Sequence, residues 1–344
     1  MALAVENAWS GSLEGIAVTR YKHGLPTRHI RVVEAGHPVP DEAGENAARE
    51  ILEEVKRLGA QDLLLALISG GGSSLLSLPA PGVTMAELKA LTGKLLKSGA
   101  DIREMNTVRK HLSAIAGGRL AAASRAPVVA LIISDVVGDD PTHIASGPCA
   151  ADPTTIDDAK AVLAKYGVEF RGPFSESPKS VKAENKVIGA AYRSLEAAAA
   201  VFRKGGFKPL ILGDTITGEA REVGRAMAQL VSRTQGPAAL ISGGECTVTI
   251  AGEGGRGGRC TEFLLSLGIE TGGIWAIAAD TDGIDGSEDN AGAVLTPGSM
   301  RQGGDGKAFL DRHDSYGFFS ALGDLVITGP TRTNVNDYRA ILIT

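Results

Sequence analysis

The stretch LLLALISGGGSS, residues 63–74, joins a continuous apolar run to three consecutive glycines between serines. An uninterrupted apolar run of this length is typical of a strand that helices bury on both faces, as in a parallel sheet. Three glycines in a row are costly, because glycine loses the most backbone entropy on folding. Two interpretations are open: an ordinary tight turn, or a set of backbone N–H groups that binds an anion such as phosphate.

Strand-like and helical segments alternate on both sides of this stretch. This alternation is typical of an open sheet with helices on its faces, so it predicts an α/β fold with a parallel sheet. In the first half of the chain the expected strands are residues 15–20, 30–35, 63–68 and 128–134. The expected helices are residues 41–58, 84–98 and 105–123, the last with a Gly-Gly interruption.

The polar stretch RGPFSESPKSVKAEN, residues 171–185, is the expected domain boundary. We therefore predict an N-terminal α/β domain over residues 1–178 and a second α/β domain over residues 183–344. In the second domain we expect extended segments at 185–191, 208–213, 238–252, 274–280 and 324–329, and helices at 194–204, 217–233, 261–266 and 316–322.

Bulk composition excludes several classes of protein. The formal charge of −5 argues against the basic surface of a nucleic-acid-binding protein. The chain has no run of about 18 apolar residues for a membrane span, and its start lacks the pattern of a secretory signal. Three cysteines without CxxC spacing indicate neither a disulfide framework nor a zinc site. We expect a cytoplasmic protein that binds neither nucleic acid nor membrane.

Three of the predicted strands end in loops rich in polar residues: 69–74, 134–148 and 280–292. Ligands of open α/β sheets bind at the carboxyl ends of strands, so the three loops predict an anion-and-metal site. Asp135, Asp139 and Asp140 offer the hard oxygen ligands that Mg²⁺ prefers, although Asp140 before proline is equally typical of a helix cap.

The third polar loop offers Asp280, Asp282 and Asp285 in a loose likeness to a calcium loop. The EF-hand spacing needs an oxygen ligand where Ile284 stands, so we reject that motif.

The run GEGGRGGR, residues 252–259, satisfies the dinucleotide pattern G-x-G-x-x-G through Gly252, Gly254 and Gly257. It lies late in the chain, opens only a short predicted helix and lacks an evident βαβ unit, so the pattern is weak. A loop that uses arginine to bind a carboxylate or a transferring phosphoryl group explains it better.

The basic helix segment that contains Arg109, Lys110, His111 and Arg119 has two interpretations. A basic helix face is most often a solvated surface, and beside an acidic loop it is also a plausible anion-binding surface.

Several stretches together resemble the class II glycerate kinases, whose C-terminal part is the MOFRL domain, here about residues 237–344. The resemblance implies a Rossmann-like N-terminal domain, an active site in the cleft between two domains, and transfer of a phosphoryl group from ATP, with Mg²⁺, to D-glycerate. The usual product of the family is 2-phosphoglycerate, and some of its members have been labelled hydroxypyruvate reductases. The stretches that carry the resemblance are residues 63–80, 104–123, 134–148, 254–259, 278–293 and 328–341.

The chain departs from the family pattern at several positions. Chains of the family usually carry a further strand and a Gly-x-Gly-Lys turn, with a lysine thought to be catalytic, ahead of the segment that MALAVENAWSG resembles. Ala116 stands where the family has a lysine, Cys149 where it has a threonine, and Cys260 where it often has an asparagine.

The resemblance and the loops together predict a set of site residues. Arg259 would stabilise the transferring phosphoryl group, and Arg109 with Lys110 would bind the glycerate carboxylate. Asp135 and Asp280 would hold Mg²⁺ or accept the hydroxyl proton, and Asp282 would be a further metal ligand. The expected phosphate or nucleotide ligands are Ser69, Gly70, Gly71, Gly72, Ser73 and Ser74.

Two alternative functions remain open from the sequence: an NAD(P)H-dependent hydroxypyruvate reductase and a non-catalytic metabolite-binding homologue. The expected partners are glycerate and a nucleotide, and a homodimer is compatible with the sequence.

Overall fold

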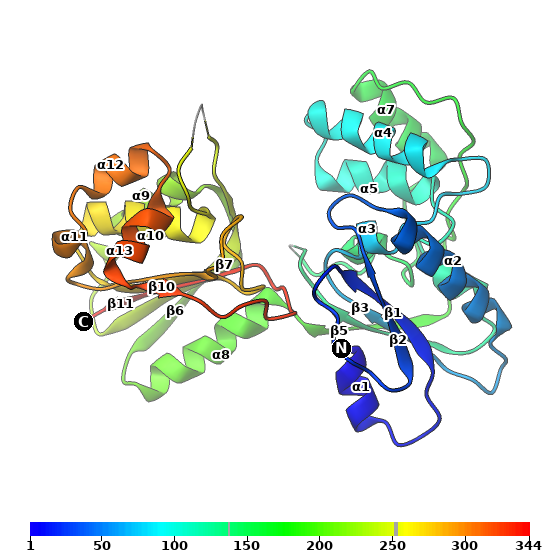
Figure 1. The fold of residues 1–344 in the computed structure, drawn as a ribbon, viewed down its shortest axis with the longest axis horizontal. Helices are drawn as coiled ribbons and strands as arrows, with labels where there is room; N and C mark the ends of the chain where they lie inside the picture. The colour runs from blue at the N-terminus through cyan, green and yellow to red at the C-terminus, as the bar shows by residue number, and fades with distance from the viewer. Residues whose placement is uncertain (137, 251–253) are drawn as a thin grey trace. The chain divides into compact units, whose positions relative to one another are not determined.

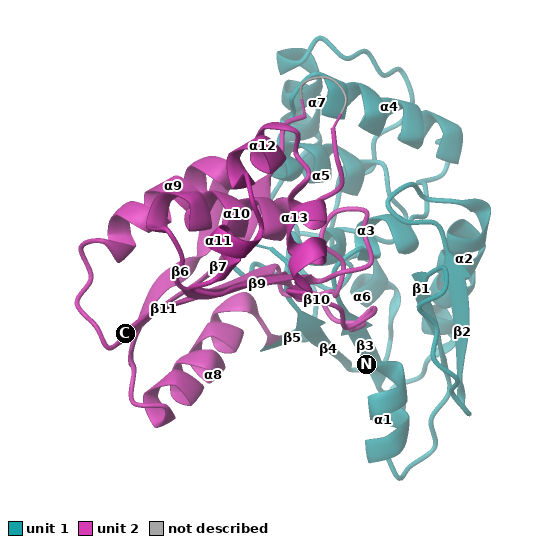
Figure 2. Ribbon diagram, turned by 60° about the vertical axis from the view of Figure 1, so that its left-hand side comes forward, with its two compact units in different colours: residues 1–188 teal, residues 189–344 magenta. Residues whose placement is uncertain are grey.

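A computed structural model describes residues 1–136, 138–250 and 254–344 of the chain. The chain divides into two compact units, Met1–Ile188 and Gly189–Thr344 (Figures 1 and 2). The predicted second domain began at residue 183. In the structure, strand β5 (Ala183–Gly189) pairs with β4 of unit 1, so the division falls at the end of this strand, not before it.

Unit 1 contains two small parallel sheets where the alternation predicted one. Strands β1 (Gly15–Arg20) and β2 (Ile30–Ala35) form a two-stranded parallel sheet. The second sheet has the order β3-β4-β5, in which β3 (Leu64–Ile68) and β4 (Val128–Ile133) are parallel, with Leu64 opposite Val128. The four strands predicted in the first half of the chain are therefore present.

The helices of unit 1 begin at caps that the sequence provides. Thr84, Asp101 and Thr155 each form a capping box, in which two orphan N–H groups are satisfied reciprocally. The helices are α1 (Ala2–Ala8), α2 (Glu42–Arg57), α3 (Gly72–Leu75), α4 (Met85–Lys97), α5 (Ile102–His111), α6 (Arg119–Ala123) and α7 (Ile156–Lys165), with a short 3₁₀ turn at Ile144–Ser146.

The helix predicted over residues 105–123, with an interruption at Gly117-Gly118, is two helices in the structure, α5 and α6, and the interruption is longer than predicted because it spans residues 112–118. Helix α5 ends at His111, and Gly117 and Gly118, with left-handed φ angles of +62° and +82°, form a turn directly before α6. Their N–H groups donate to the carbonyls of Ser146 and Gly147, at 2.9 and 2.7 Å. The chain therefore turns between α5 and α6, and the two hydrogen bonds hold the loop that follows β4 against this turn.

Unit 2 is built on a six-stranded sheet of order β10-β9-β8-β11-β7-β6. Only β6 and β7 are parallel; the other described pairs are antiparallel, so the sheet is mixed. The strands are β6 (Lys208–Glu219), β7 (Ala238–Thr247), β8 (Trp275–Asp280), β9 (Gly292–Leu295), β10 (Leu325–Val326) and β11 (Asp337–Ile343).

The strand predictions in unit 2 need correction at three strands. The strand expected over 324–329 is reduced to the two residues of β10, and neither β9 nor the central strand β11 is predicted. β11 pairs with both β7 and β8, which lie far away in the sequence. Pairing of this kind is invisible in a local pattern.

Helix α10 (Arg259–Thr271) is the core helix of unit 2, and it is twice as long as the predicted segment 261–266. Phe263, Leu264, Leu265 and Leu267 are fully buried. A helix that is buried on all sides lacks the amphipathic period by which sequence analysis finds helices.

The other helices cover the two faces of the sheet. α8 lies on the face opposite α9 and α10 (Figure 1). These helices are α8 (Ala191–Lys204), α9 (Ala220–Val231), α11 (Ser299–Gln302), α12 (Gly306–Asp311) and α13 (Ser315–Leu322). None of the helices in the described ranges is long and apolar enough to cross a membrane.

Candidate functional site

The glycine turn after β3 approaches the loop after β4 more closely than any side chain would allow. A Cβ on Gly70 would lie 2.2 Å from Oδ2 of Asp135, and a Cβ on Gly72 would lie 2.5 Å from Cβ of Ala145. Gly71 has a φ of +79° and caps α3. Because β3 and β4 are parallel neighbours, their carboxyl ends bring the turn and Asp135 to one edge of the sheet.

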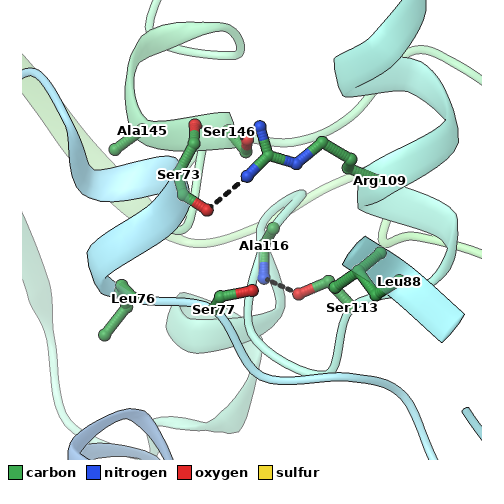
Figure 3. A pocket seen from close by; sticks show the side chains of 9 residues that line it. All are labelled: Ser73, Leu76, Ser77, Leu88, Arg109, Ser113, Ala116, Ala145 and Ser146. Carbon is green, nitrogen blue, oxygen red and sulfur yellow. Dashed lines mark hydrogen bonds between the residues drawn. The ribbon is translucent and has the colours of Figure 1, made fainter. Parts of the chain in front are cut away.

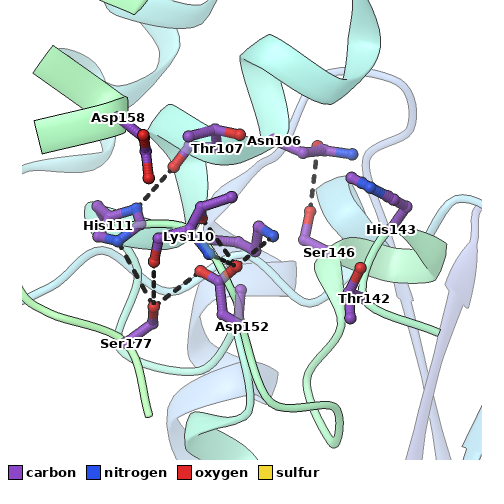
Figure 4. Close-up of polar contacts among 12 residues, drawn as sticks. Asn106, Thr107, Lys110, His111, Thr142, His143, Ser146, Asp152, Asp158 and Ser177 are labelled. Carbon is purple, nitrogen blue, oxygen red and sulfur yellow. Dashed lines mark hydrogen bonds and ion pairs between the residues drawn. The ribbon is translucent and has the colours of Figure 1, made fainter. Parts of the chain in front are cut away.

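The loop after β4, which lies against the glycine turn, has an unusual backbone conformation. Ala145, Ser146 and Gly147 have φ angles of +51°, +60° and +60° in succession. Such conformations cost about 1–3 kcal/mol for a non-glycine residue and persist where the surroundings impose them. Here the hydroxyl of Ser146 contacts that of Ser73 at 2.7 Å and donates to Oδ1 of Asn106 at 3.3 Å (Figures 3 and 4).

Arg109, the predicted ligand of the glycerate carboxylate, lies beside the glycine turn. Its Nη2 donates to the carbonyl of Ser73 at 2.5 Å, and burial lowers the pKa of its guanidinium. The arginine lines a small pocket of about 20 Å³, room for a water-sized group. Figure 3 shows Ser73, Ser77, Ser113, Ala116 and Ser146 around the same pocket.

Lys110 does not lie with Arg109, although the two were predicted as joint ligands of the substrate. Its ammonium group is fully buried and donates to Oδ1 of Asp152 at 2.7 Å (Figure 4). Consecutive residues of a helix point in different directions, so Arg109 and Lys110 serve different contacts. Burial alone would raise the pKa of Asp152, but hydrogen bonds from Lys110, Ser177 and Thr154 lower it to about 2.

In unit 2, Arg259 is the first residue of α10 and contacts three carboxylates. Its Nε lies 2.8 Å from Asp337, its Nη2 2.5 Å from Asp280 and its Nη1 3.2 Å from Glu245. Burial raises the pKa of Asp280 to about 7, against the opposing effect of Arg259. Arg259 and Asp280, predicted as catalytic residues, thus lie together within unit 2.

Sequence reasoning missed Asp337 and Arg339, which belong to the unpredicted strand β11. The second oxygen of Asp337 accepts from Nη2 of Arg339 at 2.8 Å, and both side chains are buried. The sequence contained a signal for these residues. Asp337 and Arg339 stand at the start of an apolar segment, and two charges are costly to bury there unless each has a partner.

Asp282 and Asp285 have local roles in the loop after β8. The carboxylate of Asp282 accepts from the amide of Ile284 at 2.8 Å, and its own amide donates to Asp280 at 3.0 Å. Asp285 is fully buried and accepts from the amides of Cys260 and Thr261, both at 2.9 Å. Asp285 therefore satisfies the first amides of α10.

The G-x-G-x-x-G pattern gains no support from this geometry. Gly252 lies outside the described residues. Side chains of unit 2 hold the described part of this loop. The guanidinium of Arg256 lies 3.9 Å from the ring centre of Tyr316 and pairs with Glu288 at 2.6 Å. A pyrophosphate would need the amides at the start of the helix, and a carboxylate already occupies those of α10.

The predicted metal ligands lie on different units, Asp135 on unit 1 and Asp280 with Asp282 on unit 2. Within the described ranges, no three side chains of His, Cys, Asp or Glu gather as a metal-binding group. The carboxylate of Asp135 at the end of β4 nevertheless fits Mg²⁺, which takes one or two carboxylates and completes its shell with water and phosphate oxygens.

The fold and these side chains define an α/β protein of two units. One unit carries a glycine turn that faces a carboxylate, and the other carries an arginine among carboxylates.

Comparison with known proteins identifies the family. Residues 1–181 match the family described as "Domain of unknown function (DUF4147)", and residues 238–337 match the MOFRL family. The D-glycerate 2-kinase of Thermotoga maritima is 42% identical over 94% of this chain and 83% of its own length. The crystal structure of glycerate kinase from the same organism superposes with a TM-score of 0.90, covering 96% of this chain and 85% of that one.

A further relative carries a different name. A protein of Agrobacterium vitis called "Putative hydroxypyruvate reductase" is 54% identical over all of this chain and 84% of its own length. The chain belongs to the DUF4147–MOFRL family, the family of the glycerate kinases.

Proposed function

We propose that this protein is a glycerate kinase that transfers the γ-phosphoryl group of ATP to D-glycerate and forms 2-phosphoglycerate. The observation that carries the proposal is the close approach of Asp135 to Gly70, which brings a carboxylate against a turn of bare backbone. Relatives named glycerate 2-kinase, at 40–42% identity, support the same reaction.

In unit 1, backbone amides of the turn Ser69–Ser74 bind phosphate oxygens, and the glycines let the anion approach without Cβ atoms in the way. Arg109 binds the glycerate carboxylate. Its guanidinium has five N–H donors, one of which holds the carbonyl of Ser73.

In unit 2, Arg259 stabilises the charge that develops on the transferring phosphoryl group, a role that contributes on the order of 10³-fold or more in rate. Asp280 accepts the proton of the glycerate hydroxyl, for which a pKa of about 7 is well matched to neutral pH. Asp135 would hold Mg²⁺, which when bound neutralises charge on the phosphate oxygens.

The test is a coupled assay of ADP release with D-glycerate, ATP and Mg²⁺. We expect release that depends on glycerate and falls by on the order of 10³-fold in Arg259→Ala. Arg233→Ala, an exposed arginine of unit 2, is the control and keeps the wild-type rate. Phosphorus NMR of the product distinguishes the 2- from the 3-phosphate.

A parallel reaction with NADH and hydroxypyruvate tests the reductase alternative, which the name of the Agrobacterium relative favours. Oxidation of NADH without glycerate-dependent ADP release would overturn the kinase proposal. Binding of glycerate without turnover of either kind would point to a metabolite-binding homologue.

A further inference from the structure

Asp280 and Asp337 lie on neighbouring strands, and both of their carboxylates pair with the guanidinium of Arg259. The two residues are direct partners in the antiparallel register of β8 and β11. Like charges in directly opposite positions of a sheet repel each other, and here both side chains are buried, with exposures of 5% and 2%. The pair therefore requires a positive charge in contact with both carboxylates, and the partly buried Arg259 supplies it.

The contacts of Asp337 differ in kind from those of the other two carboxylates around Arg259. Glu245 is exposed, so its ion pair adds little to the fixed position of the arginine. Asp337 accepts from Nε, the nitrogen nearest the aliphatic stem, and so fixes the direction from which the guanidinium extends.

Arg339 in turn holds Asp337. It donates to the second oxygen of Asp337 at 2.8 Å and to the carbonyl of Gly243 at 3.3 Å. Its guanidinium lies 5.2 Å from the ring centre of Phe263, a core residue of α10. Arg339 thus balances the second negative charge and connects it to the helix that Arg259 begins.

We propose that Asp337 is a positioning residue, which holds the guanidinium of Arg259 in the orientation that stabilises the transferring phosphoryl group, with Arg339 as its buried counter-charge. Asp337 acts through Arg259 and contacts no substrate. The inference rests on the proposed function for the role of Arg259, but the contact itself can be tested without it.

The kinetic test is a double-mutant cycle of Arg259→Ala and Asp337→Asn, which keeps the shape of the aspartate and removes its charge. We expect Asp337→Asn to lower kcat by on the order of 30-fold, with KM for glycerate and for ATP changed less than about threefold, because the substrates do not touch Asp337. In the Arg259→Ala background the same change should cost less than about threefold. Asp324→Asn, which removes a charge from a carboxylate bound to Ser299, is the matched control and leaves kcat unchanged.

Independent effects of the two substitutions, or a loss that appears in KM alone, would overturn the positioning role. A measurement on the wild-type chain does not depend on how the variants fold. The Nε–H proton of Arg259, assigned by its disappearance in Arg259→Lys, should exchange slowly in NMR because it is bonded to Asp337. Rapid exchange of that proton would refute the contact. A protein with a protected Nε–H and no ADP release would refute the kinase proposal alone.

Discussion

Gly70 shows how one missing side chain shapes the candidate site. The absent Cβ allows Asp135 to lie against the turn, whereas a methyl group would fall 2.2 Å from Oδ2 of that aspartate. Such a distance forces the turn or the carboxylate to move. Gly70 is therefore a position at which a small change should affect activity more than stability.

We predict that Gly70→Ala lowers kcat/KM in the ADP-release assay by at least about 100-fold, because displacement of catalytic groups by about 1 Å costs on that order. Gly93→Ala is the matched control. Gly93 lies within helix α4 and has open space around its Cβ position, so alanine should raise stability by about 0.5–1 kcal/mol and leave activity unchanged. Equal activity of the two variants would show that the turn does not serve the reaction.

Helix α5 joins two functions on adjacent residues, because Arg109 lines the pocket beside the turn while Lys110 is buried with Asp152. The ion pair holds α5 to the loop that precedes α7, since Asp152 also accepts from Ser177 and Thr154. Removal of one member would leave an uncompensated buried charge, which is more costly than loss of the pair.

We predict that Asp152→Asn lowers the free energy of unfolding by about 3 kcal/mol at pH 7, measured by denaturant titration. The folded-state pKa of Asp152, about 2, lies below its ordinary value of 3.8. Its stabilising contribution of about 2 kcal/mol is thus complete above pH 4 and is lost as the pH falls toward 2. Asp157→Asn, the control, changes an exposed aspartate in the first turn of α7 and should cost less than about 1 kcal/mol, the size of its interaction with the helix dipole.

Helix α10 depends on Asp285 at its start, where the carboxylate accepts from two amides and from the hydroxyl of Thr261 at 2.8 Å. We predict that Asp285→Ala lowers the free energy of unfolding by about 2 kcal/mol, since a helix cap is lost and buried donors are left without a partner. The measurement is a denaturant titration. The exposed Asp311→Ala serves as the control. A stability equal to that of the wild type would mean that water replaces the cap at no cost.

The chain as a whole consists of two units with separate hydrophobic cores. The core of unit 2 gathers around α10, and that of unit 1 lies among α2, β3 and β4, with a second cluster among α4, α5 and α7. Chains of several domains often depart from two-state unfolding.

We predict two unfolding transitions that respond separately to substitution. The chain has two tryptophans, Trp9 in unit 1 and Trp275 in unit 2. Each single-tryptophan variant therefore reports on one unit by fluorescence. Asp152→Asn should shift the transition seen by Trp9, and Asp285→Ala the transition seen by Trp275. Coincident shifts in both signals would show that the units unfold together.

The sequence determined the local elements whose signals are strong. The apolar runs of β3 and β4, the capped helices α2 and α4, and the glycine turn could all be predicted, because burial, helix caps and turns depend on residues close together in the chain. The polar stretch at residues 171–185 indicated the two-part organisation, and family resemblance added the expected chemistry; the family models match both parts.

Only the tertiary structure decided which charged residues meet. Arg109 and Lys110 are neighbours in sequence and differ in function, whereas Arg259 and Asp337 are 78 residues apart and form one ion pair. The central strand β11 and the full length of α10 were missed for the same reason, since each is stabilised by partners that are distant in the chain. Local patterns record propensity and polarity, but the pairing of strands and of buried charges is settled by packing across the whole unit.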